Sequence, residues 1–176
     1  MDLVAVFELP AKSLDEKLDQ LDAALIAHPN RLANMLRVDE FPPGLYVRTV
    51  VLEAGSVITT RIHKVDHPYF LSSGLIEVIA NDGTIQRVRG PARGTTKKGT
   101  RRAIRTIETC VWTTVHPNPD NITDIEKLEA MFTEDYPHGH LLGAGPVVVG
   151  NLSEDWRHEQ VAKKISQTCP SGSLVQ

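Results

Sequence analysis

The chain has 176 residues, which suffices for one folded domain with additional segments but would cramp two full domains. The composition is ordinary for a globular protein, with a hydrophobic fraction of 41% and a charged fraction of 23%. The formal net charge of -3 gives no reason to expect that the chain as a whole binds a polyanion. No apolar run approaches the roughly 18 residues of a membrane span, and the first ten residues lack the pattern of a secretion signal, so a cytosolic location is expected.

The N-terminal segment, residues 1–44, is predicted to be a helical arm. Ser13 and Glu16 have the spacing of a capping box, and leucines recur every three or four positions from Leu14 to Leu25, so a helix is expected over residues 13–27. About two heptads are too few for a stable coiled coil alone, so this helix is expected to pack on the rest of the protein, and its apolar face leaves room for a homodimer. A Pro-Pro-Gly turn at residues 42–44 ends the arm.

Residues 45–118 have the pattern of a small antiparallel β-barrel. Short segments rich in Val, Ile and Thr alternate with glycines and turn residues, and Asn81-Asp82-Gly83 predicts a tight hairpin. The fold class is therefore expected to be mainly β. The expected strands are Leu45–Glu53, Val57–His63, Tyr69–Ser72, Leu75–Ala80, Ile85–Arg89, Arg101–Ile104 and Thr109–His116.

Residues 119–176 are predicted to return to helix and to pack on the barrel. Thr123 and Glu126 repeat the capping-box spacing before an apolar stripe that ends at Phe132, which indicates a helix of about three turns. A loop rich in Gly, Pro and His follows, with one short strand expected at Val147–Val149, and Ser153 begins a last expected helix that runs to about residue 165.

The strand-rich segment also carries the layout of a known motif. Gly55 and Gly74 lie 19 residues apart and frame a window that contains Arg61, His63 and His67. This layout resembles the first motif of the cupin family, in which two histidines and a glutamate between such glycines point into a jelly-roll barrel and share a divalent metal. The resemblance covers some 70 of the 176 residues. Residues 61–64 and 112–117 are also similar to segments of small cupin-like proteins encoded by bacteriophages.

The positions that carry metal ligands in the cupin family are altered in this chain. Arg61 and Arg102 stand where the family has histidines, the second of them three residues beyond Gly99. Guanidinium groups have no lone pair to give to a metal, and a metal site wants about three protein ligands. The resemblance therefore implies a site built on His63 and His67, with His116 as a third ligand, and divalent iron, manganese, nickel or zinc as the candidate ion.

His63 and His67 are also the candidate catalytic residues, as metal ligands or as acid-base groups. Four residues along one straight strand would separate them by about 13 Å, so a shared site requires a bend, which residues 64–66 can provide, with Pro68 placing His67 on the next strand. His116 is expected towards the opposite end of its strand. The alternative is a pair of partly buried histidines that are only hydrogen-bonded within the barrel.

Arg61 and Arg102 are the candidate ligand-binding residues. If both point inward, two fixed guanidinium groups replace the positive charge of the metal and favour a carboxylate or phosphate ligand. The alternative is that Arg61 pairs with a carboxylate such as Asp66, or lies on the outer face of the barrel because the register differs by one residue.

Basic residues are concentrated in one segment of the chain. Between Asp82 and Glu108 there are eight basic residues and no acidic one, which suits either an anion-binding surface or a solvated strand edge protected by charge. Aromatic residues for stacking bases are absent from this stretch, so it gives little support to nucleic-acid binding. His138 and His140 lie in the expected surface loop and are interpreted as solvent-exposed.

Two functions from different classes remain open at this point. The first is a cupin-like protein that binds a small anionic molecule in the barrel interior, with or without a divalent metal; if it is an enzyme, the resemblance implies isomerase or metal-dependent oxygenase chemistry. The second is a non-enzymatic viral or accessory protein, in which the barrel is a scaffold and the basic edge and terminal helices bind another macromolecule. Fold alone does not decide between them.

Overall fold

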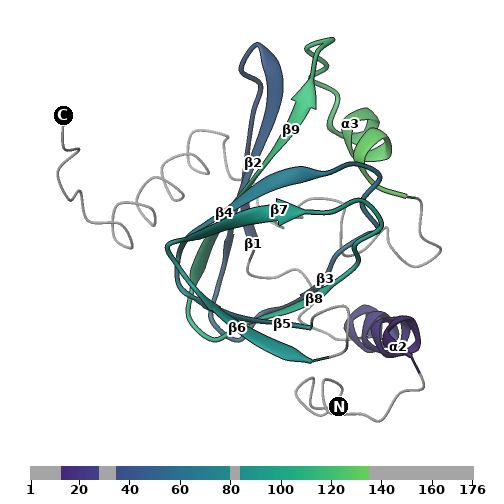
Figure 1. The fold of residues 1–176 in the computed structure, drawn as a ribbon, viewed down its shortest axis with the longest axis vertical. Coiled ribbons are helices and arrows are strands. Elements are labelled where there is room, and N and C mark those ends of the chain that lie inside the picture. The colour runs from purple at the N-terminus through teal and green to yellow at the C-terminus, as the bar shows by residue number, and fades with distance from the viewer. Residues whose placement is uncertain (1–12, 28–34, 80–83, 135–176) are drawn as a thin grey trace, which may run out of the picture.

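The computed structural model describes residues 13–27, 35–79 and 84–134, and within these ranges nine strands and two helices form (Figure 1). In chain order the elements are α2 (Leu14–Ala27), β1 (Met35–Glu40), β2 (Gly44–Leu52), β3 (Val57–Thr59), β4 (His67–Ser73), β5 (Leu75–Ile79), β6 (Ile85–Arg89), β7 (Ala92–Thr96), β8 (Ala103–Thr106), β9 (Cys110–Asn118) and α3 (Ile125–Phe132).

The strands form two antiparallel sheets that face each other. One sheet has five strands in the order β1-β2-β9-β4-β7, and the other has four in the order β3-β8-β5-β6. The chain passes repeatedly from one sheet to the other, and Figure 1 shows the two sheets enclosing a common interior. This arrangement is a jelly roll. The prediction of a mainly β jelly-roll barrel with flanking helices is confirmed.

Side chains alternate between the interior and the outside along each strand, and this alternation decides what the barrel contains. On β2, Arg48, Val50 and Leu52 face the interior, whereas Val51 belongs to a separate apolar cluster with Val111 on the outer face of the same sheet. The apolar core of the interior is made by one inward cluster from both sheets: Leu52, Leu71, Ile76, Val78, Ile104 and Cys110.

The two glycines that frame the motif are required by the backbone. Gly55 and Gly74 adopt φ angles of +81° and +92°, which side chains with a Cβ rarely tolerate. At Gly74 a Cβ would also lie 2.6 Å from the carbonyl oxygen of Thr109. The spacing that made the motif recognisable therefore reflects two tight turns between the sheets.

Helix α2 is docked on the four-stranded sheet by apolar packing and by charge. The Ser13 hydroxyl accepts a hydrogen bond of 3.2 Å from the backbone N–H of Glu16, as the capping-box spacing predicted. The apolar face of the helix forms one cluster with two residues of the barrel: Leu18, Leu21, Leu25, Ile79 and Ala103. At its edge, Arg101 donates to Asp22 across 2.5 Å, and the Thr59 hydroxyl donates to the same carboxylate.

The structure corrects several boundaries. Strands β1 and β7 were not predicted, and β1 lies within the segment expected to be a helical arm, where it pairs with β2 along its whole length. Strand β8 begins two residues later than expected. The N-cap of α3 is Asp124 rather than Thr123, and the helix has 8 residues, fewer than the three turns expected.

Some predictions lie outside the described residues. They are the hairpin at residues 81–83, the short strand at 147–149, the last helix from Ser153, and the loop with His138 and His140. Of the helices that the structure describes, none has the length and apolar character needed to cross a bilayer.

Candidate functional site

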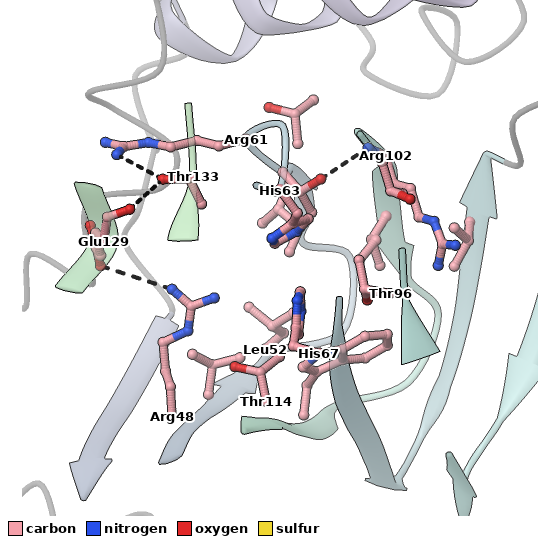
Figure 2. Close-up of a pocket in the computed structure, with 18 of the residues that line it drawn as sticks. Arg48, Leu52, Arg61, His63, His67, Thr96, Arg102, Thr114, Glu129 and Thr133 are labelled. Carbon is pink, nitrogen blue, oxygen red and sulfur yellow. Dashed lines mark hydrogen bonds and ion pairs between the residues drawn. The ribbon is translucent and has the colours of Figure 1, made fainter. Parts of the chain in front are cut away.

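A cavity of about 120 Å³ lies inside the barrel and is the candidate site (Figure 2). Strands of both sheets line it, together with residues of α3 and the segment between β3 and β4. Its walls combine apolar side chains, threonines, two histidines, four arginines and one glutamate: Arg37, Arg48, Val50, Leu52, Ile58, Thr59, Thr60, Arg61, His63, His67, Val78, Thr96, Thr100, Arg102, Ile104, Trp112, Thr114, Glu129 and Thr133.

His63 and His67 are brought together by the bend that the sequence predicted. The chain leaves β3, passes His63, turns at residues 64 and 65, and enters β4 at His67. The backbone N–H of His63 donates 3.2 Å to the carbonyl of Thr100, which fixes this residue at the end of the four-stranded sheet. The two imidazole rings face each other, with their centroids 4.5 Å apart. They are 7% and 2% exposed, so both are buried groups of the cavity wall.

Burial keeps these histidines neutral. Desolvation, followed by the neighbouring His67 and the positive charges of Arg48 and Arg102, lowers the pKa of His63 to about 3. Desolvation likewise lowers the pKa of His67, against a hydrogen bond to the carbonyl of Val65 that raises it. At neutral pH each ring therefore offers one N–H donor and one lone pair.

His116 lies next to His67, not at the far end of the barrel as expected. Strand β9 pairs with β4, with Tyr69 opposite Thr114, and two residues further along this register His67 and His116 meet with ring centroids 4.3 Å apart. The ring of His116 stacks on Phe132 at 4.5 Å and does not line the cavity. Burial lowers its pKa to about 2.

Arg61 and Arg102 both line the cavity, but they are placed differently. The guanidinium of Arg61 extends to the hydroxyl of Thr133 at 3.5 Å. The alternative partner proposed for it, Asp66, accepts hydrogen bonds from the side chain of Lys97 and the backbone of Lys98 instead. Arg102 stays near the imidazoles, and its backbone N–H donates 2.9 Å to the Thr60 hydroxyl.

Arg48 is a cavity residue that the sequence reasoning missed. Figure 2 shows it on the opposite side of the two imidazoles from Arg102. Its guanidinium lies 3.9 Å from Glu129 of α3, and its side chain is 24% exposed. The signal was present in the alternation of β2, where Arg48 shares the inward face with Val50 and Leu52, but a cation in a strand is normally assigned to the outside.

A buried ionic network holds Glu129, the carboxylate that pairs with Arg48. Arg37 of β1 donates to Asp39 at 2.8 Å, to Glu129 at 2.8 Å and to the hydroxyl of Tyr46 at 2.7 Å. The carboxylates of Asp39 and Glu129 thereby compensate the positive charge of Arg37. Glu129, held by Arg37, in turn fixes the position of Arg48 at the cavity wall.

Two buried polar atoms of the cavity wall have no hydrogen-bond partner among the described residues. They are Nδ1 of His63 and the hydroxyl of Thr114; the hydroxyl of Ser73 and Nδ1 of His116 also have no partner in the part of the chain that the structure describes, but these two residues do not line the cavity. A buried polar group without a partner costs on the order of 1–3 kcal/mol, so native structures rarely leave one unpaired without a functional or structural reason. Both atoms belong to residues that border the same cavity as the arginines.

A metal centre of the cupin type does not fit this set of donors. Among the residues that the structure describes, His63 and His67 are the only histidines that line the cavity, and the third predicted ligand, His116, contacts His67 from outside it. Within residues 13–27, 35–79 and 84–134 no group of three His, Cys, Asp or Glu side chains is arranged to hold an ion. The cations Arg48 and Arg102 beside the imidazoles add repulsion for a divalent ion.

The basic stretch before Glu108 is largely paired. Arg87 and Arg105 both bind the carboxylate of Glu77, and Arg89 binds Glu108 with 3.0 and 2.9 Å hydrogen bonds. Lys97 binds Asp66, and Arg101 binds the acidic residues of α2. This surface therefore presents less unpaired positive charge than the sequence indicates.

Among the comparisons with known proteins, only the comparison with solved structures found similar proteins. No known protein family matches the chain, and no curated protein matches it. An acetylacetone dioxygenase from Acinetobacter johnsonii is similar at 15% identity, covering 48% of this chain and 60% of its own, with a TM-score of 0.42. The Cupin_2 domain of an XRE family transcriptional regulator from Enterobacter cloacae is similar at 15% identity, covering 48% of this chain and 97% of its own, with a TM-score of 0.40.

KdgF from Halomonas sp. is similar at 18% identity, covering 50% of this chain and 83% of its own, with a TM-score of 0.41. One of these three structures is described as a cupin domain, and the similarity to each of the three extends over about half of this chain. At such identities a likeness concerns the fold and not the activity. The jelly-roll assignment itself rests on the strand order of this chain.

Proposed function

We propose that this protein binds a small anionic molecule in the cavity of its jelly-roll barrel. Arg48, Arg61 and Arg102 supply the positive charge, and His63, His67 and Thr114 supply hydrogen-bonding groups. The single observation that carries the proposal is the unpartnered pair of buried atoms, His63 Nδ1 and Thr114 Oγ1, on the wall of a cavity that is also lined by cations. A bound anion would satisfy both kinds of group at once.

The proposed role of the histidines is binding rather than acid-base catalysis. A group with a pKa of about 3 takes up almost no proton at neutral pH, so His63 is a weak general base. A neutral imidazole beside two arginines can still donate its N–H to an oxyanion. Metal-dependent oxygenase chemistry would need a ligand set that the described residues do not supply.

Isothermal titration calorimetry with acetate, citrate and inorganic phosphate tests the proposal. The wild-type protein should bind at least one of these anions with a stoichiometry of one per barrel. Arg48→Gln and Arg102→Gln should each weaken binding by about tenfold to a hundredfold, because a hydrogen bond to a charged group contributes about 1.5–3 kcal/mol.

Arg89→Gln is the matched control. Arg89 is 61% exposed, is paired with Glu108 on the outside of the barrel and does not line the cavity, so its loss should leave the affinity unchanged. Equal weakening by all three substitutions would indicate a nonspecific charge effect and would contradict the proposal. Failure of all three anions to bind would contradict it as well.

A further inference from the structure

The inner wall of the barrel changes character along its length. On the five-stranded sheet, Arg48 lies opposite Thr114, and the next inward layer has Val50 opposite Trp112. The layer after that has Leu52 opposite Cys110. Polar side chains thus occupy one end of this wall and apolar side chains the other.

The four-stranded sheet has the same gradient in the same direction. Ile58 lies opposite Ile104, which lies opposite Val78. One layer further, the backbones of Thr60 and Arg102 are hydrogen-bonded to each other at 2.8 Å, and His63 follows. The polar ends of the two walls coincide, because His63 meets His67 of the other sheet.

The apolar ends coincide as well. Leu52, Val78 and Ile104 belong to a single buried cluster, and Val50, Ile58 and Trp112 pack against it. Leu52 is 2% and Ile104 is 4% exposed, so the innermost part of this end is buried. The cavity is therefore amphipathic, with its cations gathered at one end.

From this gradient we infer that the ligand is a small carboxylic acid with an apolar chain or ring, bound with its carboxylate at the polar end of the cavity, beside Arg48 and the two imidazoles, and its apolar part against Val50, Trp112 and Ile104. The inference rests on the proposed anion site and goes beyond it by naming the ligand class. An anion that is hydroxylated or charged along its whole length would leave the polar groups that enter the apolar end without partners, which disfavours sugar phosphates.

A single negative charge also suits the electrostatics. Arg37 is already bound by Asp39, Glu129 and Tyr46, and Glu129 offsets part of the charge of Arg48. The charge offered to a ligand at the polar end is that of Arg48 and Arg102, which lie near the neutral imidazoles. A carboxylate accepts hydrogen bonds from such a fork in the plane of the guanidinium.

Calorimetric titration with the linear series acetate, butyrate and hexanoate, beside inorganic phosphate, tests the inference. Each methylene that enters the apolar end should raise the affinity about fourfold, since burying one contributes about 0.8 kcal/mol. The gain should stop at the chain length that fills the cavity, and hexanoate should bind more tightly than phosphate.

Two substitutions on one strand provide a matched pair. Val50→Thr keeps the shape of an inward residue but makes it polar, so it should reduce the gain per methylene while leaving the affinity for acetate close to that of wild type. Val47→Thr makes the same change on the outward face of β2, away from the cavity, and should alter neither quantity.

The possible outcomes separate the two proposals. If acetate and phosphate bind but lengthening the chain adds nothing, the amphipathic-acid inference is overturned and the anion site stands. If no member of the panel binds, both fall together. An affinity that rises with chain length in wild type and in Val47→Thr, but less in Val50→Thr, supports both.

Discussion

His116 contributes to the pH dependence of stability without belonging to the cavity. Its pKa is about 2 in the folded protein, because burial disfavours its charged form, against about 6.5 in an unfolded chain. Between these values the unfolded state binds the extra proton, so stability is fully present above about pH 6.5 and is lost as the pH falls. His63 and His67, whose pKa values are also lowered, add to the same loss.

His116→Phe should flatten this pH dependence. A phenyl ring can keep the stack with Phe132 and Tyr46 but cannot take up a proton, so the free energy of unfolding should fall by about 1–2 kcal/mol less between pH 7 and pH 5 than in wild type. Urea denaturation at a series of pH values measures it. Carboxylates titrate mainly below this window, near about pH 4. Parallel profiles for the two proteins would show that His116 is not buried in its neutral form.

At the scale of elements, α2 is a structural part of the barrel rather than a detachable arm. Leu21 is 1% exposed and contacts the four-stranded sheet through the cluster with Ile79 and Ala103. Leu21→Ala should lower the free energy of unfolding by about 2–4 kcal/mol, the usual cost of an internal cavity. Chemical denaturation followed by tryptophan fluorescence measures the change.

Gln20→Ala is the control on the same helix, because Gln20 is exposed and alanine has a higher helix propensity. It should leave the stability within about 0.5 kcal/mol of wild type. If Leu21→Ala also left the main unfolding transition unchanged, α2 would be an independent arm, and the docking seen between Asp22 and Arg101 would contribute nothing to the barrel.

The elements that were predicted and those that were missed differ in one physical respect. Strand β2 and helix α2 have apolar residues on their buried faces, so local signals located them: leucine spacing and a capping box for the helix, and β-branched composition with flanking turn residues for the strand. On strand β1 the residues that face the interior are charged, and the apolar residues lie on the outer face. Its inward residues are Arg37 and Asp39, which are stable there only because Glu129, 92 positions away from Arg37, completes their network. A partner that distant in sequence leaves no local signal.

At the scale of the whole molecule, the sequence predicted the barrel and the two histidines of the cavity, His63 and His67. It did not predict other residues that surround them, such as Arg48 and Trp112. The glycines at 55 and 74 located His63 and His67, since two positive φ angles impose recognisable residues. The cavity depends on strand order and register. Arg48 and Trp112 enter it because β2, β9 and β4 are adjacent, whereas His116, on the same face of β9 as Trp112, lies further along the strand, against Phe132.

Nitrogen chemical shifts of the histidine side chains give the most direct test of the account. On addition of the anion that binds best, the Nδ1 resonance of His63 should move, because this buried atom of the cavity wall gains a hydrogen-bond partner. The resonances of His116, whose Nδ1 is also buried without a partner among the described residues but which does not line the cavity, should stay in place. An anion that binds without moving the His63 resonance, or that moves only signals on the outside of the barrel, would contradict a ligand site in the interior.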